Sequence, residues 1–200
     1  MRILPALVVS AGIVWFAHSS AERWMELTTL GSSKGTAWDA GGENHFSPEE
    51  NLERLDVEYL RKARQSVDVA VYAFTDLAIA KVLREVSDRG VTVRLYRDRG
   101  QYEAEELKAV RFHQPSTTRL LRGARNVHIR VKQGSEQNLM HLKAACVDRR
   151  ILRDGSANWS PSGEKSQDNN ARFTSSPEEI KKFDRVFEAM WSRSSNLVIQ

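Results

Sequence analysis

Cysteine is almost absent from this sequence, which has 200 residues and a single thiol at Cys146. One thiol cannot form a disulfide within the chain, so packing has to stabilise the fold. Long apolar runs are scarce too, because residues 3–17 fall short of the roughly 20 residues of a membrane-spanning helix. Histidine, cysteine and carboxylate residues do not cluster at metal-ligand spacings, so we predict no metal site and no cofactor.

The N-terminus has the layout of an export signal. A basic start precedes the apolar stretch 3–17, and small residues follow at Ser19 and Ala21, spaced as at a signal-peptidase site. We therefore predict that residues 1–21 are a cleaved signal peptide. The alternative is an uncleaved membrane anchor that tethers the protein through residues 3–17. Either outcome places the body of the protein outside the cytoplasm, in the periplasm or secreted.

Acidic residues are missing from one long segment. Between Lys108 and Ser135 the sequence has no Asp or Glu, although it is rich in Lys and Arg. A net charge of +4 and a pI of about 9.3 favour acidic partners such as nucleic acid or anionic lipid. The segment is either a solvated basic face or a surface for a polyanion. We predict a nucleic-acid surface formed by Arg119, Arg122, Arg125 and Arg130.

Hydrophobic periodicity predicts one α/β domain. A flexible, glycine-rich linker is expected over residues 22–43, and the domain over residues 44–200. Ser47 is expected to cap a first helix, and Thr75 or Asp76 to cap the helix that joins two parallel strands. Further strands are expected at 127–132, 139–147, 151–154 and 171–174, and further helices at 102–110, 117–122 and 177–191. The fold class is therefore a mixed β-sheet flanked by helices on both faces.

The residues that carry chemistry are grouped in two short segments. In a strand, His141 and Lys143 project to the same face, because the side-chain period is two. Ser156 and Asn158 share a face by the same spacing, after Gly155, whose missing side chain would let the backbone approach a ligand. This set suits a phosphate group. Lys143 supplies charge, Ser156 and Asn158 supply donors, and His141 is a nucleophile near neutral pH.

These residues fit the pattern His-x-Lys-x4-Asp-x6-Gly-Ser-x-Asn, which resembles the signature of the phospholipase D superfamily. The pattern is filled by His141, Lys143, Asp148, Gly155, Ser156 and Asn158. The resemblance extends over roughly residues 44–192 and implies the phospholipase D-like fold. It also implies a role for each motif residue. His141 would be the nucleophile and pass through a phosphohistidine, Lys143 and Asn158 would contact phosphate, Asp148 would hold the site by ion pairing, and Ser156 would orient it.

The motif is present once, whereas catalysis in the family uses two histidines, one as the nucleophile and one as the acid. The resemblance therefore implies a homodimer in which two His141 side chains meet at one shared site. One position departs from the family, where a downstream acidic residue often holds the nucleophilic histidine. Here the segment 167–170 reads Gln-Asp-Asn-Asn, so we expect either Asp168 or Asn170 to orient His141, with Glu164 as the next candidate.

Three functions compete on this basis. The leading one is a metal-independent phosphodiesterase, a broad-specificity endonuclease that acts on DNA or RNA. The second is a phospholipase D or cardiolipin hydrolase-type activity on anionic phospholipid. The third is a nucleic-acid-binding relative that has weak or no hydrolysis.

Overall fold

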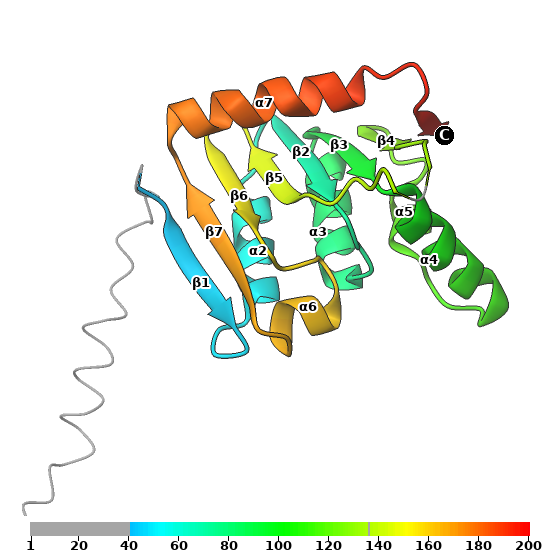
Figure 1. Ribbon diagram of the computed structural model, residues 1–200, viewed down its shortest axis with the longest axis horizontal. Coiled ribbons are helices and arrows are strands. Elements are labelled where there is room, and N and C mark those ends of the chain that lie inside the picture. The colour runs from blue at the N-terminus through cyan, green and yellow to red at the C-terminus, as the bar shows by residue number, and fades with distance from the viewer. Residues whose placement is uncertain (1–40, 136) are drawn as a thin grey trace, which may run out of the picture. The chain divides into compact units, whose positions relative to one another are not determined.

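A computed structural model of the chain describes residues 41–135 and 137–200 (Figure 1). The predicted signal peptide or anchor at residues 1–21 lies outside the described residues, as does nearly all of the predicted linker. Within the described ranges, no helix is long and apolar enough to cross a membrane.

The described chain alternates between strands and helices. The strands are β1 (Glu43–Ser47), β2 (Ser66–Val71), β3 (Thr92–Arg97), β4 (Val127–Val131), β5 (Lys143–Val147), β6 (Ile151–Gly155), β7 (Asn169–Thr174) and β8 (Leu197–Ile199). The helices are α2 (Leu52–Arg61), α3 (Leu77–Asp88), α4 (Arg99–Arg111), α5 (Thr117–Leu121), α6 (Pro161–Lys165) and α7 (Pro177–Trp191).

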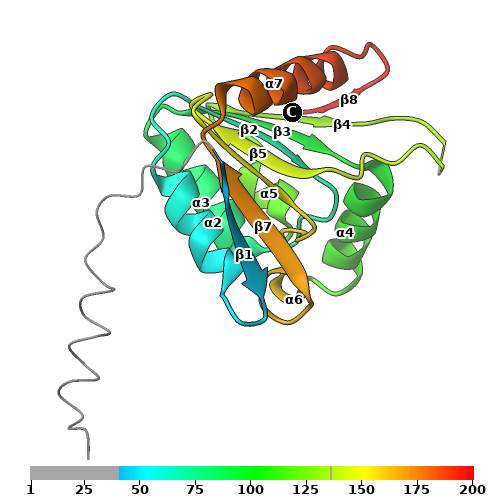
Figure 2. The same cartoon turned by 60° about the vertical axis from the view of Figure 1, so that its left-hand side comes forward.

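The strands form one 8-stranded sheet in the order β1-β7-β6-β5-β2-β3-β4-β8. The central strands β2, β3 and β4 are parallel, and the other pairs are antiparallel. Figures 1 and 2 show α7 on one face of the sheet and α2, α3 and α6 on the other. The predicted mixed sheet with helices on both faces is therefore confirmed.

Each face of the sheet has its own hydrophobic core. The larger core joins the sheet to α2 and α3 and includes Tyr59, Leu83 and Trp159, all fully buried. The smaller core lies under α7, where Phe183 and Phe187 pack on Cys146 and its neighbours. Burying a large apolar side chain contributes ~1.5–3 kcal/mol, so both layers support the sheet. Burial raises the pKa of the Cys146 thiol to about 12, which makes this thiol a poor nucleophile.

Local signals explain most boundaries, and the start of the domain differs from the prediction. Asp76 caps α3, as expected, by accepting hydrogen bonds from the first turn. By contrast, Ser47 ends strand β1, and the first helix is capped by Asn51. The edge strand β1 pairs with β7 far along the chain, and its short sequence gave no periodicity to detect. Helix α6 and strand β8 were not predicted either.

The register of the central strands aligns their ends along two borders that run across the sheet, and these borders are distinct from the edge strands β1 and β8. Val71 of β2 pairs with both Lys143 of β5 and Arg97 of β3, so these three residues mark what we call the Lys143 edge. Val67 pairs with Val147 at the other end of the same strands, which we call the Asp148 edge. Asp148 follows Lys143 by five positions along the chain, which is a distance of roughly 16 Å in an extended strand.

Candidate active site

His141 and Lys143 lie in contact at the Lys143 edge. The Lys143 ammonium lies 3.0 Å from Nδ1 and 3.2 Å from Nε2 of His141 and donates to the His141 carbonyl at 2.9 Å. The backbone here is fixed to β2, because the Tyr72 amide donates to the Leu142 carbonyl at 2.7 Å. His141 precedes strand β5 rather than lying within it, yet the predicted proximity of the two side chains is confirmed.

An aromatic ring supports this pair. The Tyr72 ring lies 4.4 Å from the His141 ring and 5.0 Å from the Lys143 ammonium, within the range of a cation–π contact. His141 is exposed, whereas Lys143 is only 9% exposed. Burial lowers the pKa of Lys143, because desolvation disfavours its charged form. An anion bound beside this ammonium would favour its charged form.

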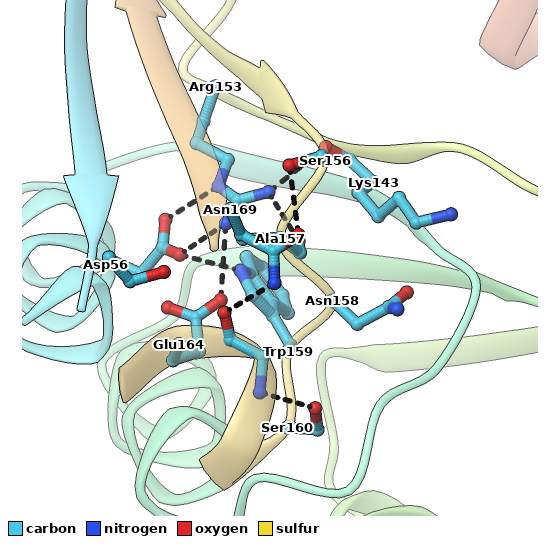
Figure 3. Close-up of polar contacts among 12 residues, drawn as sticks. Asp56, Lys143, Arg153, Ser156, Ala157, Asn158, Trp159, Ser160, Glu164 and Asn169 are labelled. Carbon is cyan, nitrogen blue, oxygen red and sulfur yellow. Dashed lines mark hydrogen bonds and ion pairs between the residues drawn. The ribbon is translucent and has the colours of Figure 1, made fainter. Parts of the chain in front are cut away.

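Asn158 lies on the same side of the sheet edge. Its side-chain oxygen accepts a hydrogen bond from the Ala73 amide at 3.2 Å, one residue beyond Tyr72. Its amide nitrogen makes no hydrogen bond within the described chain, so it can donate to a ligand. Lys143 and Asn158 extend toward the same open side (Figure 3). The structure thus brings together His141, Lys143 and Asn158.

Ser156 has a different position from the one predicted. Its hydroxyl donates to the Asn169 side chain at 3.0 Å and accepts from the Asn170 amide at 2.9 Å. The hydroxyl is thereby engaged with β7 and orients the Asn158 segment, which is the positioning role implied by the resemblance rather than phosphate contact. Gly155 has φ +138, and a Cβ there would collide with the Asn170 carbonyl. The close approach that requires glycine is therefore to the backbone of strand β7.

Asp148 does not hold the site by ion pairing. It lies at the Asp148 edge, and its carboxylate accepts the backbone amides of Arg64, Gln65 and Ser66 at 2.9, 2.7 and 2.9 Å. These bonds fix the entry of the chain into β2. Asp148 lies in the turn after β5, and the length of that strand separates it from His141 and Lys143. Its hydrogen bonds are therefore to the backbone that leads into β2.

None of the three residues expected to orient His141 contacts its ring. Asp168 is exposed and makes no polar contact with the described residues. The Asn170 side chain accepts from the Ser156 amide at 3.0 Å. Glu164 is fully buried beneath the site. Within the described chain, the only hydrogen-bond contact of the His141 ring nitrogens is therefore Lys143.

The sequence gave no indication of Arg153, a fully buried arginine behind the site (Figure 3). Its guanidinium binds both carboxylate oxygens of Asp56, at 3.1 and 2.9 Å, and Glu164 at 3.2 Å. It also donates to the carbonyls of Lys143 at 3.1 Å and Ala157 at 3.0 Å. The Trp159 ring nitrogen donates to Asp56 at 2.8 Å.

Glu164 is the second acid of this buried group. Burial, and then the neighbouring Asp56, raise the pKa of Glu164 to about 10. The Glu164 carboxyl is therefore protonated at neutral pH, and the Arg153 charge is balanced by Asp56 alone. Glu164 is engaged with Arg153 and makes no hydrogen bond with His141.

The four arginines of the predicted nucleic-acid surface are not gathered at the catalytic pair. Arg119 is paired with Glu106 at 2.9 Å, and Arg130 lies over the Trp191 ring and donates to its carbonyl. Arg122 and Arg125 precede β4, whose first residue is in register with the Asp148 edge. Arg122 and Arg130 instead line one pocket beside β4, together with His128 of the same acid-free segment. Of its cations, Lys132 follows the end of β4, on the side of the Lys143 edge.

No group of three or more His, Cys, Asp or Glu residues that could hold a metal ion occurs in the described part of the chain. The described site offers a phosphate the ammonium of Lys143, and the imidazole of His141 lies in contact with it. An imidazole and an ammonium at the end of a mixed sheet, with an amide beside them, define an α/β domain built for phosphodiester chemistry.

The chain belongs to the phospholipase D superfamily, since the family described as cardiolipin synthase, PLD-like domain, matches residues 57–191. The curated relatives include mitochondrial cardiolipin hydrolases. The human protein is 31% identical over 72% of this chain and 52% of its own length, and the Danio rerio protein is 30% identical over 72% and 60%. The chain thus spans little more than half the length of these relatives.

Solved structures share the same fold. NucT from Helicobacter pylori is 25% identical, with a TM-score of 0.62 over 75% of this chain and 94% of that chain. Nuc from Salmonella typhimurium, described as a phospholipase D family member, is 20% identical, with a TM-score of 0.63 over 78% and 97%. Domains of this superfamily that consist of little more than this fold are therefore found elsewhere.

Proposed function

We propose that the protein is a metal-independent phosphodiesterase that cleaves DNA or RNA through a phosphohistidine on His141. The observation that carries the proposal is the contact between His141 and Lys143, beside the unpaired amide of Asn158. Lys143 and Asn158 would bind the non-bridging oxygens of a phosphodiester, and the exposed imidazole would attack the phosphorus.

The chemistry has two displacements at phosphorus. In the first, a neutral nitrogen of His141 forms a P–N bond while the P–O bond to the leaving group breaks, and a general acid protonates the leaving oxygen. In the second, water attacks the phosphohistidine, its proton passes to the group that acted as acid, and the P–N bond breaks. The products are an alcohol and a phosphate monoester. Lys143 would stabilise the negative charge on the phosphoryl oxygens in both transition states.

The general acid is best supplied by a second copy of the chain. In the described chain no hydrogen bond or ring contact joins His141 to another histidine, and His45 instead bonds Glu50 at 2.7 Å. An apolar cavity of about 440 Å³ lies beside Leu142 and is lined by Leu152, Phe183 and Val186. Leu142, which separates the catalytic residues, is 39% exposed. We therefore propose a homodimer whose two His141 side chains share one site.

Nucleic acid is the preferred substrate because the chain is basic, with a net charge of +4, and carries a single compact domain. We further propose that the protein acts outside the cytoplasm, in the periplasm or after secretion, or tethered to a membrane through residues 3–17. Arg119, Arg122, Arg125 and Arg130 would then assist at most at a distance from the reaction.

Anionic phospholipid is the second candidate substrate. The curated relatives are described as mitochondrial cardiolipin hydrolases, and that similarity favours a lipid phosphodiester. A protein that binds nucleic acid without hydrolysing it is the remaining alternative, because no carboxylate among residues 41–135 and 137–200 contacts the His141 ring.

One assay separates these functions. Wild type and His141→Ala are incubated with plasmid DNA, RNA and cardiolipin vesicles in the presence of EDTA. The proposal expects wild type to cleave the nucleic acids, His141→Ala to be inactive, and acid-labile phosphate to be trapped on histidine in denatured wild type. Cleavage of cardiolipin alone would assign the lipid function, and binding of DNA without any cleavage would assign the third alternative. Activity that EDTA abolishes and magnesium restores would contradict the mechanism.

A further inference from the structure

A pocket of about 420 Å³ adjoins the catalytic pair and has no assigned role. It lies between the start of α4 and the segment that leads to His141, and Tyr72 is one of its walls. The Tyr72 ring also contacts His141 and Lys143, so the pocket lies on the other side of the ring that supports this pair. A group bound there would be a near neighbour of a phosphate held by Lys143.

Most of the side chains that line this pocket carry polar or charged groups. Arg99 and Glu103 line it and pair with each other at 2.7 Å, and Asn138 and Ser135 add hydrogen-bonding groups. Leu139 is the only aliphatic side chain among its described lining residues. Such walls suit a ring-sized, hydrogen-bonding group such as a nucleoside better than the acyl chains of a lipid. The Tyr72 ring offers the aromatic surface on which a base can stack.

Two charged groups reach this pocket in addition to the Arg99–Glu103 pair. The Asp98 carboxylate is only 3% exposed and is engaged with the backbone amides of Gln101 at 3.2 Å and Met140 at 3.0 Å. The Lys132 ammonium donates to the Leu139 carbonyl at 3.0 Å and has no carboxylate within ion-pair distance among the described residues. Lys132 is therefore the cation that remains available to an anion in the pocket.

We propose that this pocket holds the nucleoside next to the scissile phosphate and that Lys132 binds the following phosphate of the strand. The proposal rests on the proposed function and adds to it a second phosphate subsite and the residue that forms it. In a polynucleotide each nucleoside lies between two phosphates. A cation on the far side of a nucleoside-sized pocket would therefore lie where the second phosphate falls. A simple aryl phosphodiester has neither the nucleoside nor the second phosphate.

Calorimetry with thymidine 3′,5′-bisphosphate and with each thymidine monophosphate tests the subsite. Wild type should bind the bisphosphate more tightly than either monophosphate. Lys132→Met should weaken bisphosphate binding by ~10-fold, the scale of a hydrogen bond to a charged group, and leave the monophosphates within about two-fold. Lys132→Arg should keep the preference, and the exposed Lys181→Met on α7 should behave as wild type. An unchanged bisphosphate preference in Lys132→Met, or equal losses with all three nucleotides, would overturn the subsite.

Two further measurements separate this inference from the proposed function. Hydrolysis of bis(p-nitrophenyl) phosphate, which has no second phosphate, reports the catalytic pair, and wild type and the control Lys181→Met should hydrolyse it equally. Hydrolysis of that diester without a Lys132-dependent bisphosphate preference would remove the subsite and leave the phosphodiesterase. A Lys132-dependent preference without hydrolysis of any diester would keep the subsite and remove the proposed catalysis. Tighter binding of glycerol 1,3-bisphosphate than of thymidine bisphosphate would assign the pocket to a lipid headgroup and overturn the proposal.

Discussion

The Arg153 guanidinium donates a hydrogen bond of 3.1 Å to the carbonyl oxygen of Lys143, the residue whose side chain faces the phosphate site. A second N–H of the same nitrogen reaches the Ala157 carbonyl at 3.0 Å, immediately before Asn158. One buried cation thus joins the two motif segments through their backbones. The bidentate contact with Asp56 fixes the plane of that cation.

Replacing Arg153 with methionine should reduce catalysis in addition to stability. Methionine keeps much of the volume but removes every donor, so Asp56 and two carbonyls lose their partner, at a cost of ~3–5 kcal/mol. In the fraction that remains folded, Lys143 and Asn158 would no longer be held together, and kcat should fall by ~10-fold or more. Steady-state kinetics on bis(p-nitrophenyl) phosphate, corrected for the folded fraction by denaturant titration, provide the measurement.

Arg94→Met is the matched control for this variant. Arg94 also makes a bidentate pair with an aspartate, Asp68, at 2.6 and 2.7 Å, but it contacts neither motif segment. Both variants should lose stability, and only Arg153→Met should lose kcat per folded molecule. Equal kinetics in the two variants would reduce Arg153 to a purely structural ion pair.

Glu164→Gln should change how stability depends on pH. The pKa of Glu164 is raised to about 10 in the folded protein, against roughly 4.3 in an unfolded chain. Its contribution to stability is therefore full below the unfolded value and is lost as the pH rises toward about 10. Glutamine cannot ionise, so the variant should gain ~1 kcal/mol or more relative to wild type between pH 5.5 and pH 8.5. Urea titrations at both pH values test this, with the exposed Glu58→Gln as a control that should show no such gain.

The catalytic pair makes a separate prediction about pH and rate. Because burial lowers the pKa of Lys143, kcat/KM should fall on the alkaline side at a pH below the ordinary lysine value of ~10.4. Lys143→Arg keeps its charge at any accessible pH, so its rate should be lower but without this alkaline decline. Lys143→Ala should lose ~10²-fold. An alkaline decline that persists unchanged in Lys143→Arg would assign it to another group.

The sequence predicted this site better than it predicted what supports the site. The spacing of His141, Lys143 and Asn158 was informative because these residues belong to one short motif. His141 and Lys143 are only two residues apart, so their contact can be read from the chain alone. Arg153 and Asp56 escaped notice because their pairing spans 97 residues, and neither residue type is expected to be buried. The predicted arginine surface stays a prediction. Arg119 pairs with Glu106, whereas Arg122 and Arg130 line one pocket beside β4, so the run of like charges in sequence does not show which of its cations would meet a polyanion.

Replacing Arg119, Arg122 and Arg125 together with glutamine tests the predicted arginine surface. Since Arg119 is paired with Glu106 and the other two precede β4 at the Asp148 edge, DNA cleavage and its salt dependence should change little. The measurement is log kcat/KM against log salt concentration for wild type, the triple variant and Lys132→Met. Only the last should flatten the slope, by about one unit or slightly less. A triple variant whose slope falls by two units or more would restore the predicted arginine surface.

The remaining question is which group orients His141, and the structure directs it away from Asp168 and Asn170. Asp168 makes no polar contact with the described residues, and the Asn170 side chain is held by the Ser156 amide at 3.0 Å. Asp168→Asn and Asn170→Asp should therefore each change the rate by no more than about two-fold. Either a severe loss in the first or a gain in the second would return one of them to the site.

If a second copy supplies the missing partner, light scattering should give twice the mass of one chain. Refolding wild type together with an excess of His141→Ala then decides between shared and independent sites. A shared site that needs both histidines leaves only wild-type pairs active, so activity should fall as the square of the wild-type fraction. A linear fall would mean that each chain works alone, and the two-histidine mechanism would have to be abandoned.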